Sequence, residues 1–225
     1  MKKLTALFIM NLMLATSLYS QVKFLAKAGV SWSSVTFNED INEQYAGDFD
    51  YGTKAGFIIG FGTEIPLGGD KFSLQPELLF HQKGYTSKYA DTELQDSYKT
   101  TLNYLEVPVL ARANFGKFYA TTGPYVGFGV GGNYKGTNTY QGITTEWEGK
   151  VKFGAEPDNY NGSDQYVNAV DFGFQFGAGM ELGLVVVDLR FGLGLTDILD
   201  KQDLNTQTLN RSLQLTVGYP LVAKK

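Results

Sequence analysis

Apolar and polar residues alternate with a period of two over long parts of this chain. Eight stretches show the pattern, and turn-rich segments separate them: 22–33, 53–65, 71–84, 101–113, 118–132, 169–181, 184–195 and 209–221. Period-two alternation predicts strands with two chemically different faces. No stretch keeps a helical period, so the pattern predicts an all-β domain of antiparallel strands in up-and-down order.

The connections between these stretches alternate in length. The tight ones follow the second, fourth and sixth stretches, at 66–69, 114–117 and 182–183. The long ones follow the first, third, fifth and seventh, at 34–51, 84–100, 134–168 and 196–208. All tight turns therefore lie at one end of the domain and all long loops at the other. Short periplasmic turns, long external loops and an even strand number of at least eight are typical of outer-membrane barrels.

The two faces of each strand differ in charge. In the fourth stretch, Leu105 and Val107 share an apolar face, while Glu106 and Arg112 lie on the polar one. The polar faces together carry most strand glycines and twelve charged residues: Lys23, Lys27, Lys54, Glu64, Glu77, Lys83, Glu106, Arg112, Asp171, Glu181, Asp188 and Arg190. An eight-stranded barrel leaves inside only enough room for side chains. Glycine-rich faces with six basic and six acidic residues fit that crowded lumen better than the wet outer wall of a soluble, lipocalin-like barrel.

Aromatic residues on the apolar faces fall into two groups. Five lie near the tight-turn ends of the strands: Phe24, Phe61, Phe72, Phe118 and Tyr219. Five more lie towards the long loops: Trp32, Phe57, Phe80, Phe128 and Phe172. Two such belts match the interfacial girdles of membrane barrels. The pattern thus predicts an eight-stranded antiparallel up-and-down transmembrane β-barrel whose lumen is filled by the twelve charged side chains.

The start of the chain has the organisation of a secretory signal peptide. Lys2 and Lys3 precede an apolar run from Leu4 to Leu14, and small and polar residues follow up to Ser20. We therefore expect residues 1–20 to be cleaved before Gln21 and 21–225 to form a single domain. No later apolar run reaches the ~18 residues of a membrane-spanning helix.

Composition excludes several kinds of function. The 225 residues contain no cysteine, which excludes disulfides, cysteine-ligated metals, a cysteine nucleophile and a lipid anchor on cysteine. The net charge of −4 gives no basic footprint for nucleic acid. The four long loops hold 16 acidic and 6 basic residues. This acidic rim is either a solvated surface or a means of bridging to anionic outer-leaflet lipid through divalent cations, which prefer oxygen ligands.

Three motifs suggest chemistry but have simpler interpretations. Residues 127–132 match G-x-G-x-x-G, yet no helix follows to make a dinucleotide site. His81 shares a polar face with Lys83 and Glu77, and no serine pairs with it in the pattern, so we interpret it as a buried, hydrogen-bonded histidine. The acidic segment 156–164 lacks the ligand spacing of a calcium-binding loop. We predict no catalytic residue, no cofactor and no metal site.

Six strings in the chain resemble the PorT-like outer-membrane β-barrel family. They are YGTKAGFIIG, KFSLQPELLFHQKGY, LNYLEVPVLAR, TTGPYVGFGVGG, DFGFQFGAGMEL and DLRFGLGLTDI, and the resemblance runs from about residue 21 to 219. It implies a barrel in the outer membrane of a Gram-negative bacterium and, for a founding member, a role in protein secretion. Most relatives carry no assigned activity, and a fold does not fix a function.

Three functions remain open after this comparison. The preferred one is a small non-porin barrel with a structural or interaction role. The alternatives are an accessory subunit of a secretion system and, least favoured, an enzyme that modifies outer-membrane lipid. As partners we expect outer-membrane lipid, other envelope proteins bound through the long loops, and no nucleic acid; the barrel itself is expected to be a monomer.

Overall fold

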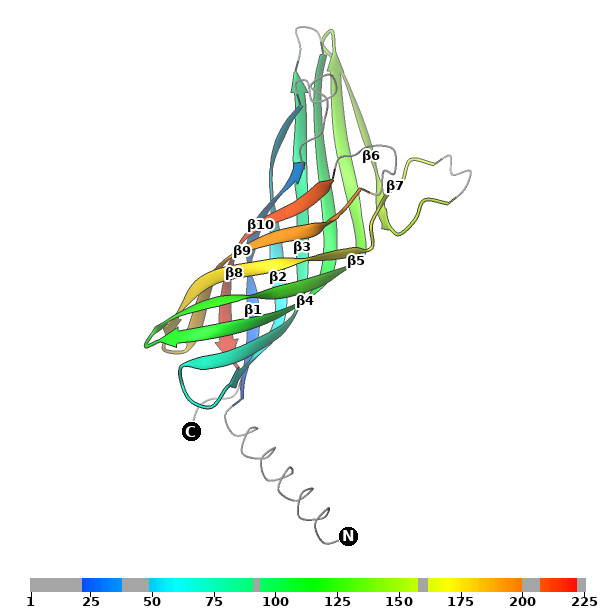
Figure 1. Cartoon of the computed structure of the whole chain (residues 1–225). Coiled ribbons are helices and arrows are strands. Elements are labelled where there is room, and N and C mark those ends of the chain that lie inside the picture. The colour runs from blue at the N-terminus through cyan, green and yellow to red at the C-terminus, as the bar shows by residue number, and fades with distance from the viewer. Residues whose placement is uncertain (1–21, 38–48, 91–93, 158–161, 200–206, 222–225) are drawn as a thin grey trace, which may run out of the picture.

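The computed structural model describes residues 22–37, 49–90, 94–157, 162–199 and 207–221, so the expected signal peptide lies outside the described residues. The described chain is built from strands (Figure 1). They are β1 (Lys23–Phe37), β2 (Phe49–Pro66), β3 (Phe72–Ala90), β4 (Leu94–Phe115), β5 (Phe118–Tyr140), β6 (Ile143–Phe153), β7 (Gln165–Val167), β8 (Val170–Leu182), β9 (Val185–Asp197) and β10 (Thr208–Pro220). Among these residues no helix is long and apolar enough to cross a membrane.

Eight of the strands close into a barrel. The order around the ring is β1, β2, β3, β4, β5, β8, β9 and β10, with β10 pairing back to β1. Every neighbouring pair in the ring is antiparallel. The predicted all-β, eight-stranded, up-and-down barrel is therefore confirmed, and each predicted stretch coincides with one ring strand.

The three tight turns lie together at one end of the barrel, as predicted. Gly68 and Gly69 in the β2–β3 turn have φ of 69° and 137°, and Gly116 in the β4–β5 turn has φ of 69°. Backbone with φ in this range is readily adopted by glycine and costs other residues energy. These turns can therefore reverse the chain within very few residues.

The prediction of four long loops is wrong for two of them. Much of 84–100 is strand, because β3 and β4 stay paired up to Ala90 and Gln95. In 134–168, β5 and β6 form a hairpin closed by Gln141 and Gly142, whose φ angles of 48° and 81° suit a two-residue hairpin turn. The segments 38–48 and 200–206, in the other two loops, lie outside the described residues.

These longer strands build a sheet that continues beyond the barrel. Parts of β2, β3, β4, β5 and β6 remain paired above the ring, and β7 adds a short parallel pairing to β6. Figure 1 shows this sheet rising from one side of the barrel. We call it the protruding sheet; it comprises residues 49–53, 85–90, 94–103, 132–140 and 143–151.

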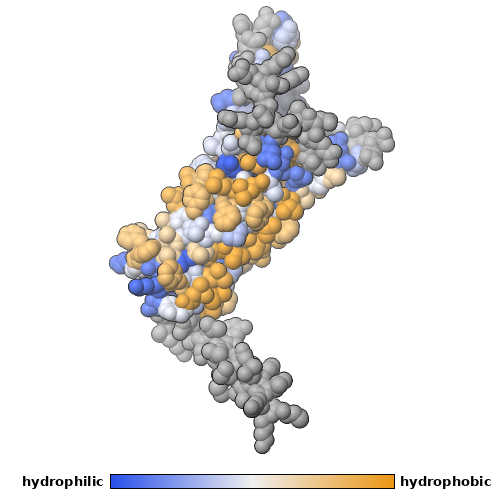
Figure 2. All heavy atoms as spheres, in the orientation of Figure 1, coloured by the Kyte–Doolittle hydropathy of each residue, from blue (hydrophilic) through white to orange (hydrophobic). Residues whose placement is uncertain are grey.

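The outer wall of the barrel is apolar. Large apolar side chains are exposed there on every ring strand, and Figure 2 shows them gathered over the barrel wall, with hydrophilic residues towards both ends. Nine of the ten aromatic residues expected in the two belts are more than 40 % exposed, from Trp32 at 41 % to Phe61 at 62 %. The tenth, Phe80, is half-buried and stacks on Phe57. An exposed apolar band of this extent is typical of a surface that faces lipid.

Candidate functional site

The inward-facing side chains form layers of charge along the barrel axis. Alternation along each strand aims every second side chain at the lumen, and β3, β8 and β9 each contribute more than one charged or polar residue. Of the twelve charged residues predicted to face inward, ten are at most 5 % exposed. The other two, Lys23 and Glu181, lie at the tight-turn end, where their side chains are 41 % and 38 % exposed.

The lower cluster lies at the tight-turn end. Lys23 contacts Glu64 at 3.1 Å and Glu181 at 3.5 Å. Arg112 contacts the same two carboxylates, Glu181 at 2.5 Å and Glu64 at 3.4 Å. Its guanidinium also lies 3.6 Å from the centre of the Tyr119 ring, where a cation is attracted to the aromatic face. Two bases and two acids from four different strands therefore meet at this end.

The middle cluster is fully buried. Arg190 donates to both carboxylate oxygens of Glu77, from Nη1 at 2.7 Å and from Nη2 at 2.9 Å. Lys27 donates to Glu77 at 2.8 Å and to Asp188 at 2.6 Å, and Arg190 also donates to Asp188 at 3.1 Å. Tyr119 donates its hydroxyl to Asp188 at 2.5 Å. These contacts join β1, β3, β5 and β9 across the whole width of the lumen.

The upper cluster is centred on Lys83. Its ammonium lies 2.6 Å from Glu106 and 2.9 Å from Asp171, and 4.4 Å from the centre of the Tyr125 ring. His81, the single histidine of the chain, places Nδ1 3.3 Å from a Glu106 oxygen. No serine hydroxyl is among the contacts of His81 within the described residues, so the Ser–His geometry of a hydrolase is not formed there.

Neutral polar residues complete these clusters. Gln75 donates to Glu77 and Gln175 donates to Glu106, each at 2.6 Å, and Asn210 donates to Asp171 at 3.0 Å. Lys54 is buried apart from the three clusters and donates to Ala55 O at 3.2 Å and Gln82 Oε1 at 3.4 Å. The charged residues were predicted from the sequence to face the lumen, whereas Gln75 and Asn210 were not singled out. They lie on the same polar strand faces as the charged residues, and this position in the sequence could have predicted that they face the lumen.

Glycines make room for the large inward side chains. A Cβ atom at Gly179 would lie 2.2 Å from the Tyr119 ring, and one at Gly173 would lie 2.7 Å from the Tyr125 ring. Both tyrosines therefore lie against glycine backbone on the neighbouring strand. A larger residue at either position would collide with the tyrosine ring, so these glycines are required by the packing of the inward side chains.

An apolar cluster lies above the upper charged cluster, at the base of the protruding sheet. Its buried members are Val35, Tyr85, Leu102, Tyr104, Tyr134, Val151, Val167 and Ile198. Phe153 packs edge-on against Tyr104 at 5.3 Å, and a Cβ at Gly129 would collide with the Phe153 ring. This cluster was not predicted, because residues 134–168 were interpreted as an acidic loop. The described residues contain no group of three or more His, Asp or Glu side chains that could hold a metal ion.

Comparisons with known proteins cover most of the chain. The family model described as outer membrane protein beta-barrel domain matches residues 16–200. No curated protein matches the chain. Solved structures that match include Ail, the attachment invasion locus protein of Yersinia pestis (10 % identity, 89 % of this chain and 99 % of that chain, TM-score 0.40). Neisserial surface protein A matches at 8 % identity over 87 % and 96 % of the two chains, with a TM-score of 0.42. OprG from Pseudomonas aeruginosa matches at 9 % identity over 90 % and 96 %, with a TM-score of 0.36.

Proposed function

The chain belongs to the outer membrane protein beta-barrel domain family, and from this premise we propose that it is a non-porin barrel with a closed lumen and an interaction role. Its lumen is filled by side chains and does not serve as a diffusion path. Its function lies in the outer membrane itself and in the protruding sheet, which the barrel holds above the bilayer.

The middle charged cluster is the observation that carries this proposal. Glu77, Asp188, Lys27 and Arg190 are each at most 4 % exposed and reach one another across the lumen. A buried charge is tolerated when it is paired and hydrogen-bonded, and removing one partner typically costs ~3–5 kcal/mol. Moving these side chains aside to admit a solute would break several such contacts at once. The lower and upper clusters repeat the obstruction on either side.

Two sequence motifs supply one acid each to the middle and upper clusters and support a PorT-like subgroup. The string LQPELLF contains Glu77, and YLEVPVL contains Glu106. The adjacent Pro76 and Pro108 lack a backbone N–H, and the pairing of β3 with β4 is interrupted between Pro76 and Leu79. Copurification after mild crosslinking, with partners identified by mass spectrometry, tests whether this chain also joins a secretion machine.

Conductance measurements test the closed lumen. We expect purified protein in planar bilayers to show no steady conductance of the size that porins give, because side chains fill an eight-stranded interior. A variant with Tyr119→Ala, Tyr125→Ala and Arg190→Ala removes three large side chains from the lumen and serves as the opened control. A stable, large, single-step conductance from the wild type would show that the lumen is a pore.

Cysteine labelling tests the orientation that the proposal assumes. The end of the barrel that carries the protruding sheet is expected outside the cell and the tight turns in the periplasm. Gly162 and Gly68 are both exposed, one near each end. On intact cells, an impermeant thiol reagent should label Gly162→Cys and leave Gly68→Cys unlabelled, while both react after lysis. Labelling of Gly68→Cys alone on intact cells would show that the barrel has the opposite orientation.

A further inference from the structure

A groove opens on the outer wall where β5 changes its neighbour. Below this point β5 pairs with β8, as far as Phe128, and above it β5 pairs with β6, from Gly132. The groove between them has a volume of about 470 Å³, and its lining includes Val130, Gly131, Lys150, Lys152 and Tyr166. That volume far exceeds the ~30 Å³ share of one water molecule. The site is therefore large enough for a chemical group of ligand size.

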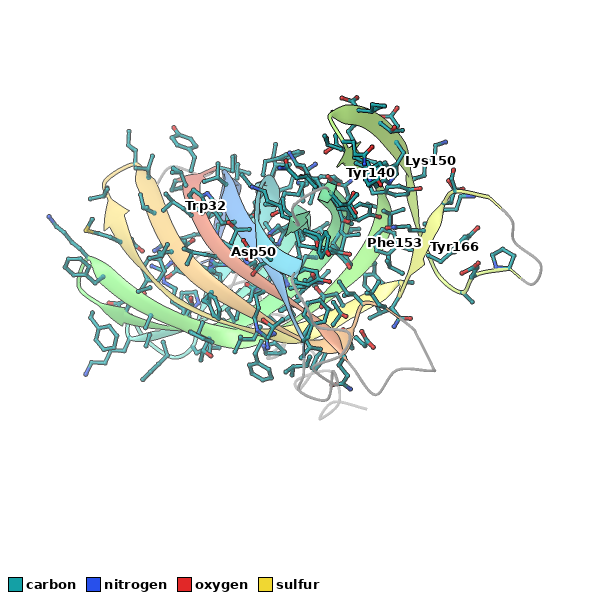
Figure 3. The ribbon with its side chains drawn as sticks, turned by 90° about the horizontal axis from the view of Figure 1, so that it is seen from above. Trp32, Asp50, Tyr140, Lys150, Phe153 and Tyr166 are labelled. Atoms are coloured by element: carbon teal, nitrogen blue, oxygen red, sulfur yellow. The ribbon has the colours of Figure 1, made fainter. Side chains whose placement is uncertain are left out.

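Two lysines give the groove positive charge. Lys150 and Lys152 are exposed on the outward face of β6, and Val151 between them is buried. Figure 3 shows Lys150 projecting away from the barrel. Lys152 pairs with Asp164 at 2.7 Å, whereas Lys150 has no carboxylate within salt-bridge distance among the described residues. The two lysines and one carboxylate leave a net positive charge.

Within the described residues, the lysine on the neighbouring strand β5 is paired with a carboxylate, unlike Lys150. Lys135 on β5 contacts Glu148 on β6 at 2.8 Å, and both side chains are well exposed. This hydrogen bond lowers the pKa of the Glu148 carboxyl below its ordinary value, so the pair stays ionised. Of the three lysines on β5 and β6, Lys135 and Lys152 are therefore paired with a carboxylate, and Lys150 at the groove is not, among the described residues.

The groove lies at the boundary between apolar and polar surface. Val130, which lines it, is 57 % exposed, and the apolar wall continues below through Phe128 at 48 % and Val170 at 42 %. Lys150 and Lys152 line it from β6, and Tyr166 lines it from β7. A ligand that uses both sides must be an amphiphile with an anionic head. Tyrosine and lysine at such a boundary are typical of the headgroup level of a membrane.

We propose that this groove binds the phosphate-bearing headgroup of an outer-leaflet lipid, with Lys150 and Lys152 contacting the phosphate. A lysine ammonium binds phosphate as a point charge, and its attraction to an anionic lipid surface is substantial at the headgroup level. The acyl chains would lie along Val130 and Phe128. The inference goes beyond the proposed closed lumen, since it concerns the outer wall, and it rests only on the orientation that the cysteine labels test separately.

Native mass spectrometry of the full-length mature protein in uncharged detergent tests this proposal. The probes are lipid A carrying two phosphates, the same lipid A after enzymatic removal of both phosphates, and inorganic phosphate. We expect the phosphorylated lipid to bind most tightly and Lys150→Gln to weaken it about fivefold. The double variant Lys150→Gln/Lys152→Gln should lose more, and Lys150→Arg should retain binding. Lys88→Gln, which removes an exposed lysine on β3, is the matched control and should leave binding unchanged.

Three results would each overturn the proposal. One is equal binding of phosphorylated and dephosphorylated lipid A, which would mean that only acyl chains are held. Another is equal weakening by Lys150→Gln and Lys88→Gln, which would reflect general electrostatics. The third is displacement of lipid A by inorganic phosphate at a similar concentration. If Lys150→Gln does not fold, the salt dependence of wild-type binding decides, because a phosphate–lysine contact must weaken as ionic strength rises.

Discussion

Replacing Glu77 with glutamine should lower the free energy of unfolding by about 3–5 kcal/mol. The buried Glu77 carboxylate accepts two hydrogen bonds from Arg190, one from Lys27 and one from Gln75. Glutamine has one acceptor oxygen and no charge, so Lys27 and Arg190 would share only Asp188. The measurement is refolding into lipid vesicles across a urea series, followed by the gel shift between folded and heat-unfolded protein.

Two companion variants separate the charge effect from general sensitivity. In Glu77→Gln/Lys27→Met one acid and one base are gone, so Arg190 and Asp188 balance each other and part of the lost stability should return. In Glu148→Gln an exposed pair is broken, and the urea midpoint should stay unchanged. If Glu77→Gln were no worse than Glu148→Gln, the middle cluster would not hold the barrel together.

Alternation along the chain was enough to predict which side chains share a face. Glu77 and Asp188 fall on polar faces in the sequence, and the structure has both buried. The period of two fixes this assignment locally, because a shift of one residue would move every side chain of a strand to the other face. The tight turns were also readable, since glycine clusters such as Gly68–Gly69 mark the ends of strands.

The partners of each charge could not be predicted from the sequence. Lys27 contacts Asp188, 161 positions away, only because β1 and β9 are separated by a single strand once the ring closes. That contact depends on the register of each pairing and on the stagger of the closed barrel. Neither quantity is encoded in a local pattern, so the sequence predicts a charged lumen and leaves its three clusters undetermined.

The protruding sheet was missed for a different reason. Residues 84–100 and 134–168 are rich in polar and charged residues, which favoured loops, although tyrosine and threonine also favour strands. Tyr98 and Tyr134 stack at 5.5 Å across β4 and β5. Such cross-strand pairs stabilise a sheet without a strictly apolar face. A strand end outside the barrel forms such pairs only with a neighbouring strand, so the pattern within one strand does not reveal them.

Placing an arginine at Val107 should destabilise the folded barrel by about 2–4 kcal/mol. Val107 lies on the outward face of β4, between Leu105 and Val109, which are each 39 % exposed. It faces Val126 across the β4–β5 pair, in the middle of the apolar wall. A guanidinium there would enter hydrocarbon with no partner, whereas leucine adds only apolar bulk. Refolding into vesicles with the gel-shift readout should therefore place Val107→Leu close to the wild type and Val107→Arg far below it.

An arginine at a different depth in the membrane is the control that distinguishes the effect of lipid from a general intolerance of arginine on β4. Ala113 lies on the same outward face, near the tight turns, and pairs with Phe72 in the lower aromatic belt. Arginine near the interface typically costs only ~0–1 kcal/mol, because its head reaches water. Ala113→Arg should thus be much milder than Val107→Arg. Equal losses of folding free energy for Ala113→Arg and Val107→Arg would contradict a lipid-facing wall, and so would full folding of the wild type without lipid or detergent. Either result would mean that water covers the apolar wall and that the charged lumen is stable without a membrane around it.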